Sequence, residues 1–251
     1  MGLGTPLVMG LRILYSQVCN KGGVGMQDVL EPDIQTKIRE SLIELLQGPL
    51  LRFQRRIVFK QQGTLVIFWD GSLTAFGACA YIVSGGGSNL LTSAGKVIGK
   101  GRYTALQSEM AATTLAVQVG CKVQTEMSDT TFTQVLYVGG LQIVCRIIAT
   151  GRPCRLDVFY GSRLMLIQEN TNPRQWAWTP GENNPADQIT RLGCKAAMLD
   201  TPFWKNGAFL NDGPEEGWPI ISCLKINTEI KHLEIKAVSV KVVNLASGRK
   251  Q

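Results

Sequence analysis

The stretch Leu65-Val66-Ile67-Phe68-Trp69-Asp70-Gly71-Ser72 decides the fold of this chain. Its first five residues are apolar and rich in β-branched and aromatic side chains, which predicts a buried strand. Asp70 closes that strand. A carboxylate at the end of a buried strand is costly to desolvate unless a cation or hydrogen-bond donors compensate it. The stretch therefore predicts a core strand with a candidate functional site at its end.

The residues on either side of this strand predict an α/β domain. A hairpin turn at residues 71–74 leads to a second strand, and the triple glycine at 85–87 leads to a third. In the helix that follows, Ala105, Ala112 and Ala116 share a face with Glu109, which lets the helix approach the sheet and aims Glu109 inward. The predicted strands span residues 65–69, 75–83, about 90–98, 122–127 and 175–178, and the predicted helices span 104–119, 130–138 and parts of 141–167.

Segments on both sides of this domain have a different character. Ile34, Ile38 and Leu42 recur at helical spacing within residues 33–47, and Gly48-Pro49 ends that helix. We expect this amphipathic helix to pack against protein and not to bind a membrane. The predicted division is a helical connection segment at 1–60, an α/β domain at 61–193 and an irregular extension at 194–251.

Composition excludes several classes of function. The single histidine, His232, argues against zinc chemistry and against a Ser-His hydrolase triad. Seven cysteines without CxxC pairs indicate reduced thiols. The N-terminus lacks a signal-peptide pattern, and no apolar run approaches the roughly 18 residues of a membrane span. The net charge of +7 and the pI of about 9.1 favour a polyanionic partner.

Four carboxylates stand where a predicted strand ends or a predicted helix begins: Asp70, Glu109, Asp129 and Asp187. Each has an ordinary explanation alone, as a hairpin turn, a helix N-terminal acid or a surface charge. Together they follow the order of the first strand, the first helix after the sheet, the end of the fourth strand and the last helix. All-oxygen ligands suit Mg²⁺. The set therefore predicts a divalent-metal site.

The motifs around these carboxylates point to a known family. They are Phe68 to Ser72, Gln107 to Ala112, Ser128-Asp129-Thr130 and Asn184-Pro185-Ala186-Asp187, and with them the chain resembles the ribonuclease H domain of retroelement reverse transcriptases. Trp178 to Asp187 is also similar to the W-x-x-V-P-x-x-x-N-P-A-D segment of Bel/Pao-type LTR retrotransposon polyproteins. Residues 203–207 and 214–219 resemble the WW-x-G-P and PEEEWP signatures of that group. The resemblance covers about residues 5–220.

This resemblance implies a ribonuclease H-like fold with a five-stranded mixed sheet flanked by helices. It implies a metal-dependent endonuclease that hydrolyses the RNA strand of RNA–DNA hybrids with two Mg²⁺ ions, for which Mn²⁺ can substitute. Asp70 would bridge both ions, Glu109 and Asp129 would lie on the leaving-group side, and Asp187 would bind the ion that activates water.

The resemblance also implies how the substrate is held and where the domain acts. Recognition would rest on phosphates and minor-groove 2′-hydroxyls. The implied partners are the reverse transcriptase and integrase regions of the same polyprotein, in a retroelement particle in the cytoplasm or in the nucleus. The implied substrate-binding residues are Gly71, Ser72, Lys96, Lys100 and Arg102.

Two other functions stay open. Many ribonucleases H carry a mobile histidine before the last aspartate, and residues 179–185 contain none, which favours a catalytically weak or inactive remnant that binds nucleic acid or acts as a scaffold. The corresponding region of Pao elements is sometimes labelled an aspartic peptidase. That chemistry needs an Asp-Thr/Ser-Gly loop, and neither Asp129-Thr130-Thr131 nor Asp70-Gly71-Ser72 fits it.

Overall fold

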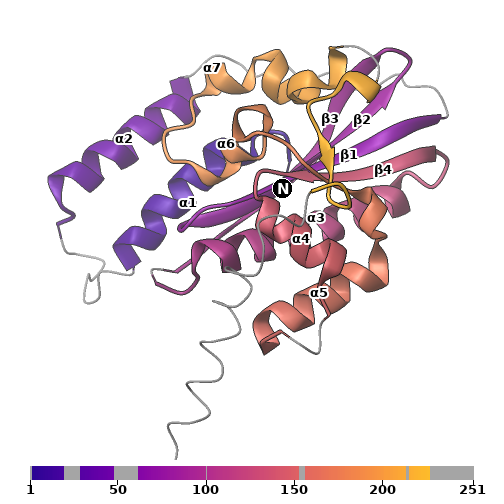
Figure 1. Cartoon of the computed structure of the whole chain (residues 1–251). Coiled ribbons are helices and arrows are strands. Elements are labelled where there is room, and N and C mark those ends of the chain that lie inside the picture. Colours follow the sequence, from indigo (N-terminus) through magenta and orange to yellow (C-terminus); the bar gives the residue numbers. More distant parts are fainter. Residues whose placement is uncertain are drawn as a thin grey trace, which may run out of the picture.

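A single mixed sheet organises the molecule (Figure 1). The computed structural model describes residues 2–19, 29–47, 62–99, 101–152, 156–212 and 215–226. The strand order is β3-β2-β1-β4-β5-β6, with β4 parallel to β1 and β5 parallel to β4, while the other neighbours are antiparallel. The strands are β1 (Gln62–Gly71), β2 (Ala75–Ser84), β3 (Gly87–Val97), β4 (Thr131–Gly139), β5 (Trp176–Trp178) and β6 (Ile221–Ser222).

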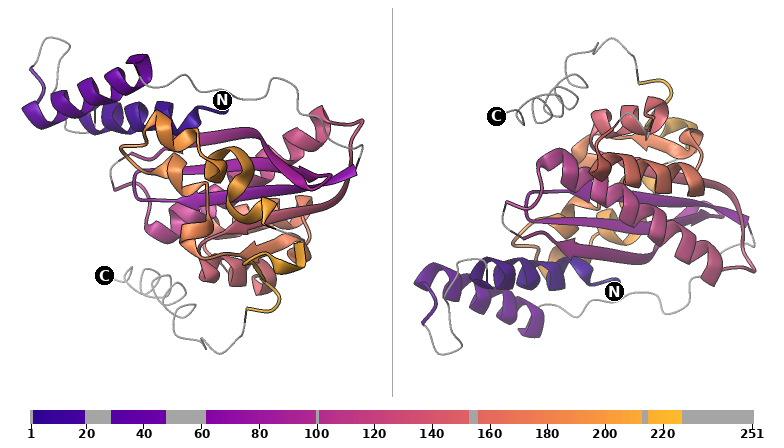
Figure 2. Two further views of the ribbon diagram at one scale, coloured as in Figure 1. Left: turned by 90° about the horizontal axis from the view of Figure 1, so that it is seen from above. Right: turned by 90° about the horizontal axis from the view of Figure 1, so that it is seen from below.

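Helices cover both faces of this sheet, as the two views in Figure 2 show. One face carries α3 (Ala105–Glu126), α4 (Gln142–Thr150) and α5 (Val158–Asn170). The other carries α1 (Thr5–Cys19) and α6 (Asp187–Thr190), with α2 (Pro32–Gln47) packed on α1 and α7 (Ala196–Leu199) near the same side. Short helical turns at Pro173–Gln175, Gly181–Asn183, Phe203–Gly207, Ala208–Asn211 and Glu215–Gly217 complete the described elements.

The expected fold class is confirmed: the sheet is mixed, flanked by helices and preceded by a helical N-terminal segment. The sequence predicts five strands, whereas the sheet of the described residues has six. The sixth strand, β6, pairs with β5 through Ala177 opposite Ser222. This pairing joins residues far apart in sequence, so local periodicity gave no signal for it.

Two hydrophobic cores lie on the two faces of β1. Leu65, Ile67 and Trp69 face α3, whereas Val66 and Phe68 face α1 and α6. All five side chains are buried. A strand buried on both faces needs apolar residues at every position, which explains the uninterrupted apolar run before Asp70.

The second core draws on the whole described chain. Met9 and Ile13 of α1 pack beside Phe68, and Trp204 and Trp218 from the C-terminal part join them. The indole of Trp204 donates a hydrogen bond to the carbonyl of Leu3 over 2.9 Å, which ties the N-terminal segment to the C-terminal part of the described chain. The predicted boundaries at 60 and 193 stay predictions.

The elements before and within β4 correct the sequence prediction. Residues 122–127 are not a strand, because α3 continues to Glu126. Val119 and Val123 extend its buried stripe at helical spacing. Gly120 lets α3 lie close to the sheet, since a Cβ there would be 2.5 Å from the hydroxyl of Tyr137.

Residues 130–138 are correspondingly not a helix, because β4 occupies them. Val135 and Tyr137 face the α3 core, and Leu136 and Val138 face the opposite core. This alternation, together with β-branched and aromatic side chains, is typical of a strand between two helical layers.

The second helix forms as predicted but packs less than expected. Ile34 is buried, whereas Leu42, Leu45 and Leu46 are 42%, 44% and 80% exposed. Among the described helices, none is long and apolar enough to span a bilayer.

Candidate active site

Asp70 lies at the carboxyl end of β1, where α3 meets the sheet. The meeting point is Gly71, since a Cβ there would lie 2.6 Å from the backbone nitrogen of Glu109 and 2.6 Å from the carbonyl carbon of Ser108. Only glycine leaves room for this backbone contact. The Asp-Gly pair therefore brings the first turns of α3, and with them Glu109, beside Asp70.

Asn184 holds the segment that carries Asp187 against the same strand end. Its buried Nδ2 donates to the carbonyl of Trp69 over 2.9 Å, and its Oδ1 accepts from the backbone N–H of Ala186 over 3.1 Å. Sequence patterns place Pro185 in the first turn of the helix, but α6 begins at Asp187. The Asn-Pro-Ala-Asp motif is thus a clamp on β1 that precedes the helix.

Asp70 is held by α6 on its other side. The hydroxyl of Thr190 donates to Oδ2 of Asp70 over 2.5 Å. Burial raises the pKa of Asp70, the Thr190 hydrogen bond works in the opposite direction, and the negative charge of Asp187 raises the pKa further. Asp70 and Asp187 therefore belong to one electrostatic cluster.

Glu109 is the most perturbed carboxyl of this cluster. Burial and then the charge of Asp70 raise its pKa to about 8, while a backbone hydrogen bond from Gly71 offsets part of this effect. Its Oε2 is buried and accepts no hydrogen bond from any described residue. The raised pKa favours the protonated form of Glu109, and a strongly perturbed carboxyl is typical of a functional site.

Asp187 already has a cationic partner. The Nε of Arg191 lies 2.7 Å from one carboxylate oxygen and 2.8 Å from the other, and the arginine side chain is 73% exposed. Arg191 also lowers the pKa of Asp70. The sequence analysis missed both Thr190 and Arg191, although the i,i+4 spacing of Asp187 and Arg191 on a helix was a usable signal.

Asp129 does not join this cluster, so its predicted role as a metal ligand is wrong. It is exposed in the turn between α3 and β4. Thr131 begins β4 opposite Gln62, the first residue of β1. Asp70 lies eight residues further along β1, or roughly 26 Å away at about 3.3 Å per residue. The two aspartates thus lie at opposite edges of the sheet, and the predicted convergence of four carboxylates fails.

Two glycines occupy the strand end where that carboxylate was expected. Because β4 is parallel to β1 and Gly139 pairs with Trp69, both strands end at the same edge, and Gly140 follows Gly139 as Asp70 follows Trp69. Neither glycine offers a side-chain ligand. The strand that ends at the site is therefore β4 and not the predicted strand at residues 122–127, and it ends without a carboxylate.

The remaining donors do not fit the predicted pair of Mg²⁺ ions. Of the three clustered carboxyls, Asp187 is paired with Arg191. Within the described ranges, no group of three or more histidine, cysteine, aspartate or glutamate side chains is arranged to hold a metal ion. Two Mg²⁺ ions need more oxygen ligands than this set provides.

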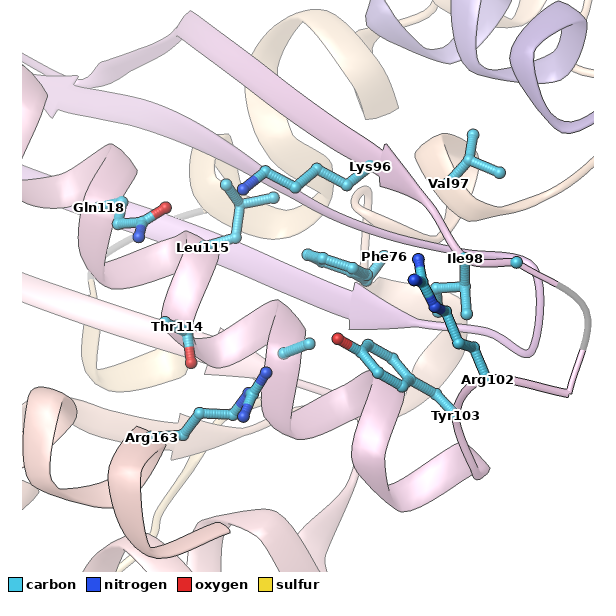
Figure 3. Close-up of a pocket in the computed structure, with 12 residues that line it drawn as sticks. Phe76, Lys96, Val97, Ile98, Arg102, Tyr103, Thr114, Leu115, Gln118 and Arg163 are labelled. Atoms are coloured by element: carbon cyan, nitrogen blue, oxygen red, sulfur yellow. The ribbon is translucent and has the colours of Figure 1, made fainter. Parts of the chain in front are cut away.

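A cationic cavity lies on the α3 face of the sheet, between β3, α3 and α5 (Figure 3). Its volume is about 290 Å³. Lys96, Arg102 and Arg163 line it from three separate elements, and no described acidic residue does. The guanidinium of Arg163 stacks 3.5 Å from the ring centre of Phe159 and donates to that residue's carbonyl. The cavity thus gathers positive charge beside α3, which carries Glu109.

The predicted substrate-binding residues have separate outcomes. Lys96 and Arg102 come together in the cavity, and Arg163 joins them without a sequence signal. Lys100 lies outside the described residues. The hydroxyl of Ser72 bonds within the β1–β2 turn and to the carbonyl of Thr190, so it braces α6. Substrate contact by any of these residues, Gly71 included, stays a prediction.

The order and direction of the strands define a ribonuclease H-like fold. A family model described as the Pao retrotransposon-like RNaseH-like domain matches residues 1–138, more than half of the chain. The chain therefore belongs to this family. The match ends at Val138, directly before Gly139-Gly140.

Solved structures similar to this chain include two ribonucleases H1 and a viral protease–reverse transcriptase. Ribonuclease H1 from the halophilic archaeon Halobacterium salinarum is 19% identical, with 51% of this chain and 94% of that chain covered and a TM-score of 0.38. LC11 ribonuclease H1 in complex with an RNA/DNA hybrid is 18% identical, with coverage of 50% and 93% and a TM-score of 0.38. The foamy viral protease–reverse transcriptase in complex with an RNA/DNA hybrid is 11% identical, with coverage of 69% and 28% and a TM-score of 0.35.

Likeness at this level adds nothing to the family assignment. The search of curated proteins gives no match.

Proposed function

We propose that this domain binds RNA–DNA hybrids as the ribonuclease H-like part of a retrotransposon polyprotein and does not hydrolyse them efficiently. The observation that carries this proposal is the end of β4, where Gly139 and Gly140 offer no side-chain ligand next to the end of β1 that carries Asp70. The sequence also predicts hydrolysis by four carboxylates and two metal ions. That mechanism is not part of the proposal, because Asp129 lies at the opposite edge of the sheet from Asp70.

Hybrid binding is supported by the charge and shape of the α3 face. Lys96, Arg102 and Arg163 surround one cavity and face no described acid across it. Phosphate groups are the anions that such a cluster would bind in a nucleic acid, and each neutralised phosphate makes affinity more dependent on salt. The proposed neighbours in the polyprotein are its reverse transcriptase and integrase regions, in a cytoplasmic particle.

The test of this proposal separates binding from cleavage. Fluorescence anisotropy with a labelled RNA–DNA hybrid should show binding that weakens as salt rises, and Arg163→Gln or Lys96→Gln should reduce both the affinity and the salt slope. Gln168→Ala, at an exposed position on α5, is a matched control that should leave both unchanged.

Cleavage is measured on the same labelled hybrid with Mg²⁺, with Mn²⁺ and with EDTA. We expect no cleavage above the level of the Asp70→Asn variant. Rapid cleavage of the RNA strand that needs Mg²⁺ and disappears in Asp70→Asn would contradict the proposal, and it would restore metal-dependent hydrolysis by Asp70, Glu109 and Asp187. An absence of hybrid binding would remove the binding function.

A further inference from the structure

Two buried cysteines meet near the β6 edge of the sheet, where α4 and β6 both pack on β5 (Figure 1). Cys145 lies in the first half of α4, and Cys223 directly follows β6. Both belong to the hydrophobic core on the α3 face of the sheet, where they are 0% and 2% exposed. The Cys145 thiol is hydrogen-bonded to the Cys223 thiol. The two sulfurs are therefore neighbours, although they come from distant parts of the sequence.

The backbone holds Cys223 at this position. Its N–H donates to the carbonyl of Trp176 over 2.8 Å, and Ser222 pairs with Ala177 across β5 and β6. Trp176 is itself fully buried, so β5 is a fixed base for the segment that carries Cys223. The contact between the two thiols follows from this strand pairing.

The other described cysteines do not form such a pair. Cys79 lies in the core on the opposite face of the sheet. Cys121 is half-buried on α3, and its thiol lies 4.0 Å from the side-chain oxygen of Asn170. Of the cysteines that the structure describes, the one on α4 and the one after β6 are thus the pair whose thiols are already in contact.

We propose that Cys145 and Cys223 form an oxidative modification site, at which a small disulfide such as glutathione disulfide converts the two thiols into one disulfide bond. The two thiols give up two electrons and two protons, and one glutathione disulfide takes them up to become two glutathione thiols. The reduced thiols that the sequence indicates are the starting state of this reaction. The bond would join β6 to α4. The proposal does not depend on the carboxylate cluster, on the cationic cavity or on hybrid binding.

Access to the buried thiols comes from the β6 side. This strand has two residues, and Ile221 within it and Leu224 after it are 44% and 54% exposed. Local opening of so short an edge strand exposes Cys223 without unfolding of the sheet. Cys223 then attacks glutathione disulfide and releases one glutathione, and Cys145 displaces the second glutathione from Cys223.

The second of these steps should be slow. The hydrogen bond with Cys223, burial and the negative charge of Glu109 raise the pKa of Cys145. A thiol attacks a disulfide as its thiolate, so a raised pKa lowers the rate. We therefore expect oxidation to take hours.

The test is prolonged incubation of the full, folded chain with glutathione disulfide, followed by alkylation of free thiols and peptide mapping by mass spectrometry. We expect one cross-linked pair of peptides, which carries Cys145 and Cys223. The linked chain should melt higher than the reduced chain by roughly 5 °C or more, because the bond restricts the unfolded chain. At one ratio of glutathione to its disulfide, the link should be favoured at least about 30-fold more in the folded chain than in urea.

Cysteine variants separate this pair from the other thiols. Cys145→Ala and Cys223→Ala should each abolish the cross-link and the rise in melting temperature on oxidation. Cys121→Ala, at the half-buried position on α3, is the matched control and should keep both. Peptide mapping of the unmodified chain decides the question even where a variant at Cys145 or Cys223 does not fold.

Three results would overturn the proposal. In the first, Cys145 and Cys223 stay free or carry only glutathione after the incubation. In the second, either of them is linked to a different cysteine. In the third, the link forms as readily in urea as in the folded chain, which would mean that the contact in the fold plays no part. A linked chain that melts no higher than the reduced chain would contradict the expected fixing of β6 to α4.

Discussion

The strands β1 and β4 run side by side in the same direction and end at the same edge of the sheet, but they end differently. β1 ends in Trp69-Asp70-Gly71, and β4 runs into Gly139-Gly140. On β1 the glycine follows a carboxylate and admits α3. On β4, Gly139 leaves space that the Trp69 ring fills, whereas the space beside Gly140 is not filled by a packed neighbour. The scaffold of the site depends on backbone contacts, whereas its chemistry depends on single side chains, so one can be lost without the other.

The largest effect should come from adding a methyl group at Gly139. Its Cβ would overlap the Trp69 ring, so Gly139→Ala should lower the free energy of unfolding by about 3 kcal/mol. Gly140→Ala is the matched control and should change it by less than about 1 kcal/mol. Urea unfolding of both variants gives the comparison, and equal losses would mean that the two glycines have the same role.

The next effect is a pH dependence that belongs to the β1 side of the site. The folded-state pKa of Glu109, about 8, is above the ordinary value of 4.5, so the folded protein holds this proton more tightly than the unfolded chain. The contribution of Glu109 to the free energy of unfolding is therefore fully present below pH 4.5 and is lost as pH rises toward and through 8.

Glu109→Gln removes this titration. In EDTA, the unmodified protein should lose on the order of 2 kcal/mol relative to Glu109→Gln between pH 5 and pH 9, since Glu109 keeps some contact with solvent. Urea midpoints measured across that range provide the test. Parallel curves for the two proteins would show that the pKa of Glu109 is the same in the folded and the unfolded protein.

A smaller effect is expected at the clamp between the two strand ends. Asn184→Ala removes the hydrogen bond to the Trp69 carbonyl and the one from Ala186, and should cost about 1–2 kcal/mol. Asn183→Ala is the control, because the Asn183 side chain makes no hydrogen bond to another described residue. Thermal melts of both variants suffice, and an unchanged melting temperature for Asn184→Ala would show that the segment is held by other contacts.

The smallest effect is expected at the opposite edge of the sheet. Asp129 is exposed, so Asp129→Asn should change the free energy of unfolding by less than about 0.5 kcal/mol and leave any response to Mg²⁺ unchanged. A changed metal response, measured as a shift in melting temperature, would place Asp129 at the site after all.

The parts of the fold that sequence predicts are those with strong local patterns. The apolar run before Asp70, the hairpin after it and the small-residue face around Glu109 each fix an element and a carboxylate, and the motif ending in Asp187 adds a third. The end of α3 lacks such a pattern, because Lys122 to Met127 suits either a helix or a strand. Asp129, the acid next to that misplaced strand, was therefore assigned to the site.

Glycine at the true end of β4 gives no signal of its own. Its meaning depends on the register between β1 and β4, which is set by contacts between residues far apart in sequence. Thr190 likewise reaches Asp70 only through the packing of α6 on the sheet. Local patterns therefore locate the elements, and their mutual packing decides which side chains meet.

The contact between Gly71 and α3 determines which parts of such a site persist as mutations accumulate. Main-chain atoms set the spacing of Asp70 and Glu109, and main-chain atoms do not change when a codon mutates. Drift can therefore erase a ligand at a neighbouring strand end while the remaining carboxyls keep their places. On the proposed function, such a copy would occupy the same hybrids that an intact relative cleaves, and would act as its competitor.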